Sequence, residues 1–346
     1  MPRRTRAPTL NDVARRANVS TASVSRVLNN VGPISNALRD QVESAIQEVG
    51  YRPKHSPPAN ASATKLKTVA IVINDALNPY FQQIVQGAQD EADPNGFLLA
   101  VFDATFDVAR QKQMLAKVAQ LPLDGLIMAS AMLSADELIQ FHKTYAIPIA
   151  VMHVRVVFPR IASIVVDFEG AACRATQHLL DLGHTRIAYL AGPTVADASQ
   201  ARRRGIESML AARSLTLSPE WAPNCTATLE GGFQSMSSVL AVSGDARPTA
   251  IIAYNDLVAI GALNAIRTHG LRVPDDISIM SFDNIPLAAH TNPPLTTVAV
   301  PKYQMGKLAI QSLMQIERGE LPHGGYTLLE STIIVRDSTM PLTPRG

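Results

Sequence analysis

The sequence of 346 residues predicts a small all-helical N-terminal domain, joined by a hinge to an α/β core of two lobes, each a doubly wound parallel sheet. Three observations predict this fold. Aliphatic residues recur at helical spacing within residues 9–50, and residues 55–66 are small, polar and proline-bearing. From residue 68 onward, short β-rich runs alternate with helix-like segments, which is typical of parallel sheets covered by helices.

Three short helices are expected between residues 9 and 50. Thr9, Ser20 and Ser35 each stand where an N-cap is needed before a stripe of aliphatic residues. Gly50 is a natural stop for the third helix. Only a few residues separate the first two helices, which is the short joint of a helix-turn-helix.

The second helix carries its polar side chains on one face. Val24, Val27 and Leu28 share the side that turns toward a small core. The outward face then consists of Thr21, Ala22, Ser25, Arg26 and Asn29. Hydroxyl groups can bond phosphates or base edges, and an arginine can grip guanine in the major groove.

Charge is distributed unevenly along the chain. Residues 1–54 hold nine Lys and Arg against four acids, a net charge of +5, whereas the whole chain carries only +2. A basic module on a slightly acidic body indicates nucleic-acid binding. On charge alone, an ordinary solvated basic tail is an equal alternative.

Ten β-rich runs are predicted in the core. They span residues 68–73, 97–102, 125–130, 147–154, 163–168, 186–192, 249–254, 278–282, 296–300 and 331–335. Ten strands divide naturally into two sheets and two lobes. In such a fold the ligand pocket lies at the carboxyl ends of the strands, here between the lobes.

The motifs of common enzyme classes are not found. The chain has no GxGxxG after a strand, no P-loop, no HExxH and no GxSxG elbow. Its histidines show no metal-binding spacing. Cys173 and Cys225 are expected to be reduced core thiols. We therefore expect no catalytic residues, no metal and no cofactor.

Motifs spread along the chain resemble the LacI family of bacterial transcription regulators. They are "TLNDVARRANVSTASVSRVLNN" and "VGYRP" near the start, "NPYF" at 78–81, "LGHTRIAYLAGP" at 182–193, "NDLVAIGALNAIRTHGLRVPDDISIMSFDN" at 255–284 and "PPLTTVAVP" at 293–301. The resemblance covers residues 9–336. It implies a DNA-binding headpiece, a hinge, and a core like that of periplasmic sugar-binding proteins. It also implies a homodimer that binds a near-palindromic operator and responds to a small sugar-like effector.

The resemblance also implies domain boundaries. The headpiece would span residues 1–54, the hinge 55–66 and the effector-binding and dimerisation core 67–340. The first lobe would comprise residues 67–164 and 297–328, and the second lobe residues 165–296 and 329–340.

By position in the family motif, the base-reading residues are Thr21, Ala22 and Arg26. Arg26 is expected to supply most of the base discrimination, about 1–3 kcal/mol for a bidentate pair. The expected phosphate contacts are Thr9, Leu10 (through its backbone), Ser20, Ser23, Ser25, Asn29, Ser35 and Tyr51.

The chain departs from the family pattern at two places. Family members carry a hinge helix whose leucine wedges into the minor groove, whereas Asn60 stands at that position here, preceded by Pro57 and Pro58. We therefore expect weaker bending of the operator than in relatives. Ser281 replaces a glycine of the family pattern.

The effector residues implied by position are Asn78, Tyr80, Phe81, His153, Arg155, Arg202, Asn255, Asp283 and Lys302. An aromatic wall with Arg, Asn and Asp suits a sugar. The count of cationic groups against a single main acid, Asp283, favours an anionic effector such as a sugar acid or sugar phosphate. A neutral sugar is the alternative if Arg155 and Lys302 face solvent or pair with acids.

The sequence thus predicts a transcription regulator, a repressor, whose operator binding is controlled by a small effector. The alternative is a small-molecule receptor with no DNA role, and an enzyme on a similar scaffold is a distant third. No apolar run reaches the length of a membrane span, and the basic start leads into no signal-peptide core. A cytoplasmic location is therefore expected, without a membrane partner.

Overall fold

The computed structural model describes residues 8–29, 34–51, 67–105, 107–194, 197–243 and 247–342. The chain divides into two compact units, Met1–Lys65 and Leu66–Gly346. Each unit has a hydrophobic core of its own, and each is described here by itself. None of the helices in the described residues is both long enough and apolar enough to span a membrane.

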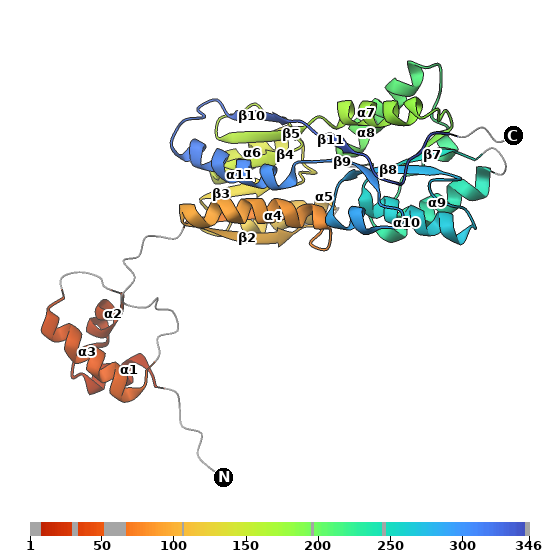
Figure 1. The fold of residues 1–346 in the computed structure, drawn as a ribbon. Helices are drawn as coiled ribbons and strands as arrows, with labels where there is room; N and C mark the ends of the chain where they lie inside the picture. Colours follow the sequence, from red (N-terminus) through yellow and green to blue (C-terminus); the bar gives the residue numbers. More distant parts are fainter. Residues whose placement is uncertain are drawn as a thin grey trace, which may run out of the picture. The chain divides into compact units, whose positions relative to one another are not determined.

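The N-terminal unit is a bundle of three helices (Figure 1). They are α1 (Leu10–Arg16), α2 (Thr21–Asn29) and α3 (Asn36–Val49). Val13, Val24 and Val42, one from each helix, are fully buried in their shared core. Gln41 of α3 donates to the Ala17 carbonyl at the end of α1, with 2.8 Å between nitrogen and oxygen. The expected helix-turn-helix is confirmed.

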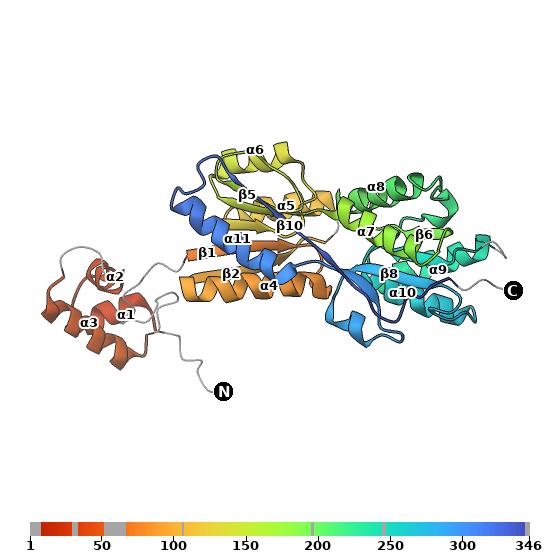
Figure 2. The ribbon, with the colours of Figure 1, turned by 45° about the horizontal axis from the view of Figure 1, so that its top comes forward.

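The second unit contains two sheets, one in each lobe (Figures 1 and 2). The first has the order β10-β5-β4-β3-β1-β2, and its strands are all parallel. The second has the order β11-β9-β8-β7-β6, in which only β11 runs antiparallel. The central strands are continuous apolar runs because both faces of each sheet are covered. This confirms the predicted fold class.

The elements of the first lobe are β1 (Lys67–Ile73), α4 (Pro79–Ala92), β2 (Phe97–Asp103), α5 (Val108–Val118), β3 (Gly125–Met128), α6 (Ala135–Tyr145), β4 (Ile149–Met152), β5 (Ile161–Val166), α11 (Lys302–Glu317) and β10 (Gly325–Leu329). Those of the second lobe are α7 (Phe168–Asp181), β6 (Ile187–Leu190), α8 (Asp197–Ala211), α9 (Leu229–Ser243), β7 (Ala250–Ala253), α10 (Asp256–Thr268), β8 (Ser278–Asp283), β9 (Thr296–Ala299) and β11 (Thr332–Ile334).

The chain passes between the lobes three times, and the passages differ slightly from those predicted. The first segment of the first lobe was predicted to end at about residue 164, but its last strand, β5, extends to Val166. The second passage, predicted at about residue 297, lies a few residues later, because β9 pairs with β8 and belongs to the second sheet. The chain returns to the first lobe only after Ala299. Sequence analysis also missed β10, an edge strand in which half-buried and exposed residues alternate.

Helices α4 and α11 lie side by side although more than 200 residues separate them in sequence (Figures 1 and 2). A Cβ atom on Gly87 would lie 2.0 Å from the Tyr303 backbone oxygen. One on Gly306 would lie 2.0 Å from the Ile84 backbone oxygen. The two glycines therefore let the helix backbones touch, and this contact fixes α11 on the first lobe.

Candidate functional site

Helix α2 presents the residues that the sequence predicted to read DNA. Thr21, Ala22 and Arg26 are exposed, while Val24 and Val27 are buried beneath them. Within the described part of the headpiece, Arg26 has no carboxylate partner, and its guanidinium only approaches the Ser23 hydroxyl at 3.5 Å. A long cationic side chain therefore stands on an outward helix face without a competing acid.

Three of the predicted phosphate-contact residues, Thr9, Ser20 and Ser35, lie at the N-termini of the three helices. Thr9 donates from its backbone nitrogen and its hydroxyl to the Asp12 carboxylate, at 2.9 and 2.6 Å. The Ser20 hydroxyl accepts from the Ser23 nitrogen at 3.1 Å, and the Ser35 hydroxyl accepts from the Leu38 nitrogen at 3.3 Å. These caps orient N–H groups at the helix starts, where anions bind favourably.

The remaining DNA candidates have mixed placements. Leu10 and Tyr51 pack against the small core, so an outward contact would come from the Leu10 backbone or the Tyr51 hydroxyl. Ser23 and Ser25 are half-buried on α2. Asn29 ends α2, but its side chain lies outside the described residues, as does the whole hinge with Pro57, Pro58 and Asn60.

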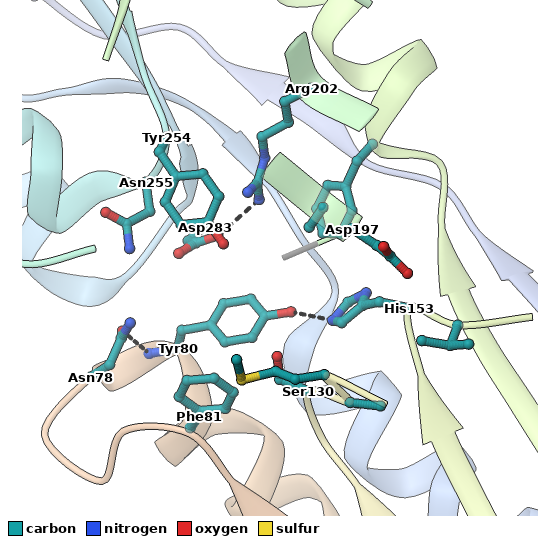
Figure 3. A pocket seen from close by; sticks show the side chains of 15 residues that line it. Asn78, Tyr80, Phe81, Ser130, His153, Asp197, Arg202, Tyr254, Asn255 and Asp283 are labelled. Carbon is teal, nitrogen blue, oxygen red and sulfur yellow. Dashed lines mark hydrogen bonds and ion pairs between the residues drawn. The ribbon is translucent and has the colours of Figure 1, made fainter. Parts of the chain in front are cut away.

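The core contains a pocket between the lobes, which we call the effector pocket (Figure 3). It holds about 610 Å³ of space outside protein atoms, part of it open to solvent. Seven of the nine predicted residues line it: Asn78, Tyr80, Phe81, His153, Arg202, Asn255 and Asp283. These residues come from both lobes, so a bound ligand would contact both.

Arg202 enters the pocket from α8 (Figure 3), and three aromatic rings surround its guanidinium. Its guanidinium lies 4.2 Å from the ring centroid of Phe168 and 4.6 Å from those of Tyr254 and Phe282. It also pairs with Asp283 at 3.7 Å, while its buried Nε atom has no hydrogen-bond partner among the described residues. These rings hold the charge away from water, and Nε remains a donor that a ligand oxygen could satisfy.

Tyr80 and His153 form a polar pair on the floor of the pocket (Figure 3). The Tyr80 hydroxyl lies 2.9 Å from His153 Nε2. Burial, and secondly the charge of Arg202, lowers the pKa of His153 to about 3. The imidazole is therefore neutral at pH 7 and adds no positive charge to the pocket.

Two amides contribute donors at the other end of the pocket. The Asn78 side-chain oxygen caps α4 by accepting from the Tyr80 nitrogen at 3.0 Å. The Asn255 oxygen caps α10 by accepting from the Val258 nitrogen at 2.9 Å. Each amide oxygen is thus used inside the fold, and the NH₂ group is the part of each residue that a ligand would meet.

Two predicted effector residues do not line the pocket. Arg155 is exposed, and its guanidinium lies 5.0 Å from the ring centroid of Tyr326 on β10. Lys302 is buried behind Tyr80 and donates to the backbone oxygens of Asp283, Asn284 and Val300. Its ammonium group holds the loop after β8 rather than facing a ligand. Two of the cations that favoured an anionic effector are therefore absent from the pocket wall.

Sequence analysis missed several lining residues, among them Ser130, Met132, Phe168, Asp197 and Tyr254. Ser130 and Met132 follow β3, and Tyr254 follows β7, so the carboxyl end of each predicted strand was a usable signal. Gly192 faces the ring of Tyr254, since a Cβ there would lie 2.4 Å from the ring carbons. A small residue that follows the neighbouring strand β6 thus makes room for this aromatic wall.

Positioning residues support the wall from behind. Buried Gln111 of α5 donates to the Ser130 carbonyl at 3.0 Å and accepts from the Met132 nitrogen at 2.9 Å. Buried Asp256 accepts from the hydroxyls of Ser281 and Thr297 and from the Ile285 nitrogen, all within 2.7 Å. The hydroxyl of Ser281, which replaces a glycine of the family pattern, therefore has a defined partner. The Gln111 bonds thus hold the loop after β3, and the Asp256 bonds hold the loop that follows Asp283.

Comparisons with known proteins agree with both units. Residues 9–54 match the model for bacterial regulatory proteins of the lacI family, and residues 176–339 match that for a periplasmic binding protein-like domain. The repressor PurR of Aliivibrio fischeri is 32% identical over 313 residues, covering 89% of this chain and 91% of that protein. The repressor CytR of Escherichia coli is 31% identical over 336 residues, 97% of each chain.

Solved structures give the same result. The lac repressor dimer, bound to operator and the anti-inducer ONPF, superposes with a TM-score of 0.72 at 28% identity, covering 97% of this chain and 100% of that one. The regulator CelR, in complex with cellobiose, superposes with a TM-score of 0.70 at 28% identity, covering 96% and 99%. From its helix-turn-helix through its two-lobed core, this chain belongs to the LacI family of bacterial regulatory proteins.

Proposed function

We propose that this protein is a transcription repressor that binds a near-palindromic operator as a homodimer in the cytoplasm and releases or holds it in response to a sugar. The proposal rests on the presence of two features in one chain. The first is an exposed basic recognition helix, and the second is a separate polar pocket lined by residues of two lobes. The lac repressor structure, a dimer on operator, supports the dimeric assembly by similarity. The pocket residues are offered as effector contacts, and the α2 residues as DNA contacts.

The charges of the pocket favour a neutral polyhydroxylated effector over an anionic one. Arg202 is offset by Asp283, Asp197 adds a second carboxylate, and His153 is neutral. Sugar hydroxyls both donate and accept, so they suit a wall that mixes carboxylates, amide NH₂ groups and one guanidinium. An added phosphate or carboxylate would meet two acids at close range.

A first experiment tests the DNA role. Selection of bound sequences from a random duplex library should yield a two-fold symmetric site. Arg26→Ala should lower the discrimination between bases at one symmetric base pair by about 1–3 kcal/mol, because the guanidinium contact is lost. Most of the salt-dependent affinity should remain. Equal weakening on all sequences would show instead that Arg26 contacts only phosphate. If the unaltered protein binds no DNA, the result would favour the alternative, a receptor without a DNA role.

A second experiment tests the effector class. Calorimetric titration of the full-length protein should detect binding of a neutral sugar such as glucose, galactose or ribose. The matched phosphate ester or sugar acid should bind more weakly. Tighter binding of the charged member of a pair would refute the neutral assignment and leave the repressor assignment intact.

A further inference from the structure

The cleft between the lobes continues past the effector pocket. A second cavity, which we call the outer pocket, holds about 940 Å³ of space outside protein atoms, much of it open to solvent. His153, Phe168, Asp197 and Ala198 line both cavities and so form the boundary between them. Asp197 and His153 lie at the end of the effector pocket away from Asn78 and Asn255 (Figure 3).

The outer pocket has an apolar wall and a polar wall. The apolar wall is the edge of the first sheet, where Leu328 of β10 pairs in register with Val165 of β5, and where Tyr326 stands two residues earlier. The polar wall is made by the second lobe at the starts of α7 and α8. Its members are Asp167, Glu169, Asp197, Gln200 and Arg204.

The apolar wall is partly uncovered. Tyr326 is 49% exposed and Leu328 is 54% exposed. The Arg155 guanidinium, which does not line the outer pocket, lies over the Tyr326 ring. Cation–π contact of this kind restricts the ring, so that it is held in place before any ligand arrives. On the opposite wall, Glu169 orients Arg204 through a bond of 2.9 Å.

A pyranose ring matches these two walls. One face of such a ring is a plane of C–H groups that packs on an aromatic side chain. Its rim carries hydroxyls, which donate to carboxylates and accept from guanidinium groups. Neither wall alone suits such a ring, but the two together offer both kinds of contact.

We propose that the effector is a glycoside of two sugar units, with one ring in the effector pocket and the second in the outer pocket against Tyr326. This inference rests on the proposed function, in which a sugar is the effector. The glycosidic linkage passes the boundary between His153 and Asp197. Arg155, which the sequence placed in the effector site, then acts as a positioning residue through Tyr326.

Calorimetry on the full-length protein tests the inference with glucose, galactose and xylose against cellobiose, lactose and xylobiose. At least one disaccharide should bind tenfold or more tightly than its monosaccharide. Tyr326→Ala should abolish that ratio and leave the affinity for the monosaccharide within twofold. Tyr145→Ala is a matched control, because Tyr145 is 42% exposed on α6 and lines neither pocket.

A second variant guards against indirect effects. Leu328→Ala should remove apolar contact with the second ring and reduce disaccharide binding about threefold or more, with the monosaccharide unaffected. Equal affinities for monosaccharide and disaccharide would overturn the inference, and so would an affinity ratio that is unchanged in Tyr326→Ala. In either case, binding of a monosaccharide would still support the proposed function. Tighter binding of a nucleoside such as cytidine than of every disaccharide would also overturn it. If no sugar of either size binds, the effector class is wrong and the inference fails with it.

Discussion

At the scale of single residues, Arg202 is the group on which we expect effector binding to depend most. Three aromatic rings surround its guanidinium, and its free Nε donor is buried. A planar guanidinium can stack on several rings while it donates at its edge, and a lysine ammonium cannot. The site is therefore specific for arginine rather than for positive charge.

Arg202→Lys should weaken the tightest-binding neutral sugar at least tenfold, about 1.4 kcal/mol, because stacking and the edge donors are lost together. Arg203→Lys serves as the control, since the neighbouring arginine pairs with Glu207 and does not line the pocket. Calorimetry measures both variants. Unchanged sugar affinity in Arg202→Lys would contradict the assignment of this residue to the effector site.

Asp256 should make stability depend on pH. Burial, and secondly the charge of Asp283, raises the pKa of Asp256 to about 7, well above the value of about 3.9 in an unfolded chain. Near pH 5 the folded protein keeps the proton while the unfolded chain has lost it. The stabilisation from this proton is complete below pH 4 and is lost as the pH rises through 7.

Asp256→Asn should remove this dependence, because the amide oxygen can accept from the Ile285 nitrogen while its NH₂ donates to the two hydroxyls. The free energy of unfolding of the unaltered protein, relative to the variant, should fall by about 2–3 kcal/mol between pH 5 and pH 8. Urea denaturation at the two pH values measures it. If the free energy of unfolding changes equally with pH in the two proteins, Asp256 remains charged in the folded protein between pH 5 and pH 8.

Position in a family motif predicted correctly which side chains face the pocket, except where a neighbouring group draws the side chain away. Asn78, Arg202 and Asp283 face the pocket as expected. Lys302 does not, because backbone carbonyls on a loop 18 or more residues away capture its ammonium group. Arg155 is drawn to the ring of Tyr326, which lies on a strand that was not predicted at all.

At the scale of elements, the contact between α4 and α11 holds the first lobe together. Gly87→Ala and Gly306→Ala should each destabilise the protein by about 1–3 kcal/mol, because the added methyl group would lie 2.0 Å from a backbone oxygen. This cost exceeds the gain of up to about 1 kcal/mol in helix propensity. Gln86→Ala, at an exposed position of the same helix, should change stability by no more than about 0.5 kcal/mol. Denaturant unfolding compares the three, and a stable Gly87→Ala protein would show that the helices can separate without cost.

Elements with strong apolar runs were predictable, and weakly patterned ones were not. The strands β1, β3, β4 and β7 are buried on both faces, so their sequences are continuous aliphatic runs. The edge strand β10 is half-buried on one face and exposed on the other, and its sequence GYTLL carries no comparable signal. Only pairing with β5 gives it a strand conformation.

At the scale of the whole molecule, we expect the hinge to determine how strongly the operator is bent. Its residues lie outside the described part of the structure, so the prediction rests on the sequence. Because Asn60 stands where relatives insert a leucine, the operator should be bent less than by those relatives, and Asn60→Leu should increase the bend. Circular-permutation gel shifts measure the angle. A sharp central kink in the unaltered complex, with no further increase in Asn60→Leu, would contradict the prediction and assign the wedge to another residue.

The three passages between the lobes have a consequence for synthesis of the protein. The first lobe lacks β10 and α11 until residues 302–329 have left the ribosome, although its other strands emerge early. Until then the nascent chain exposes two surfaces, the face of α4 that later packs against α11 and the edge of β5 that later pairs with β10. Misfolding and aggregation begin at such surfaces. The headpiece, by contrast, has its complete core after residue 51 and can fold first. Each newly made molecule thus acquires its DNA-binding surface long before it acquires the means to control it.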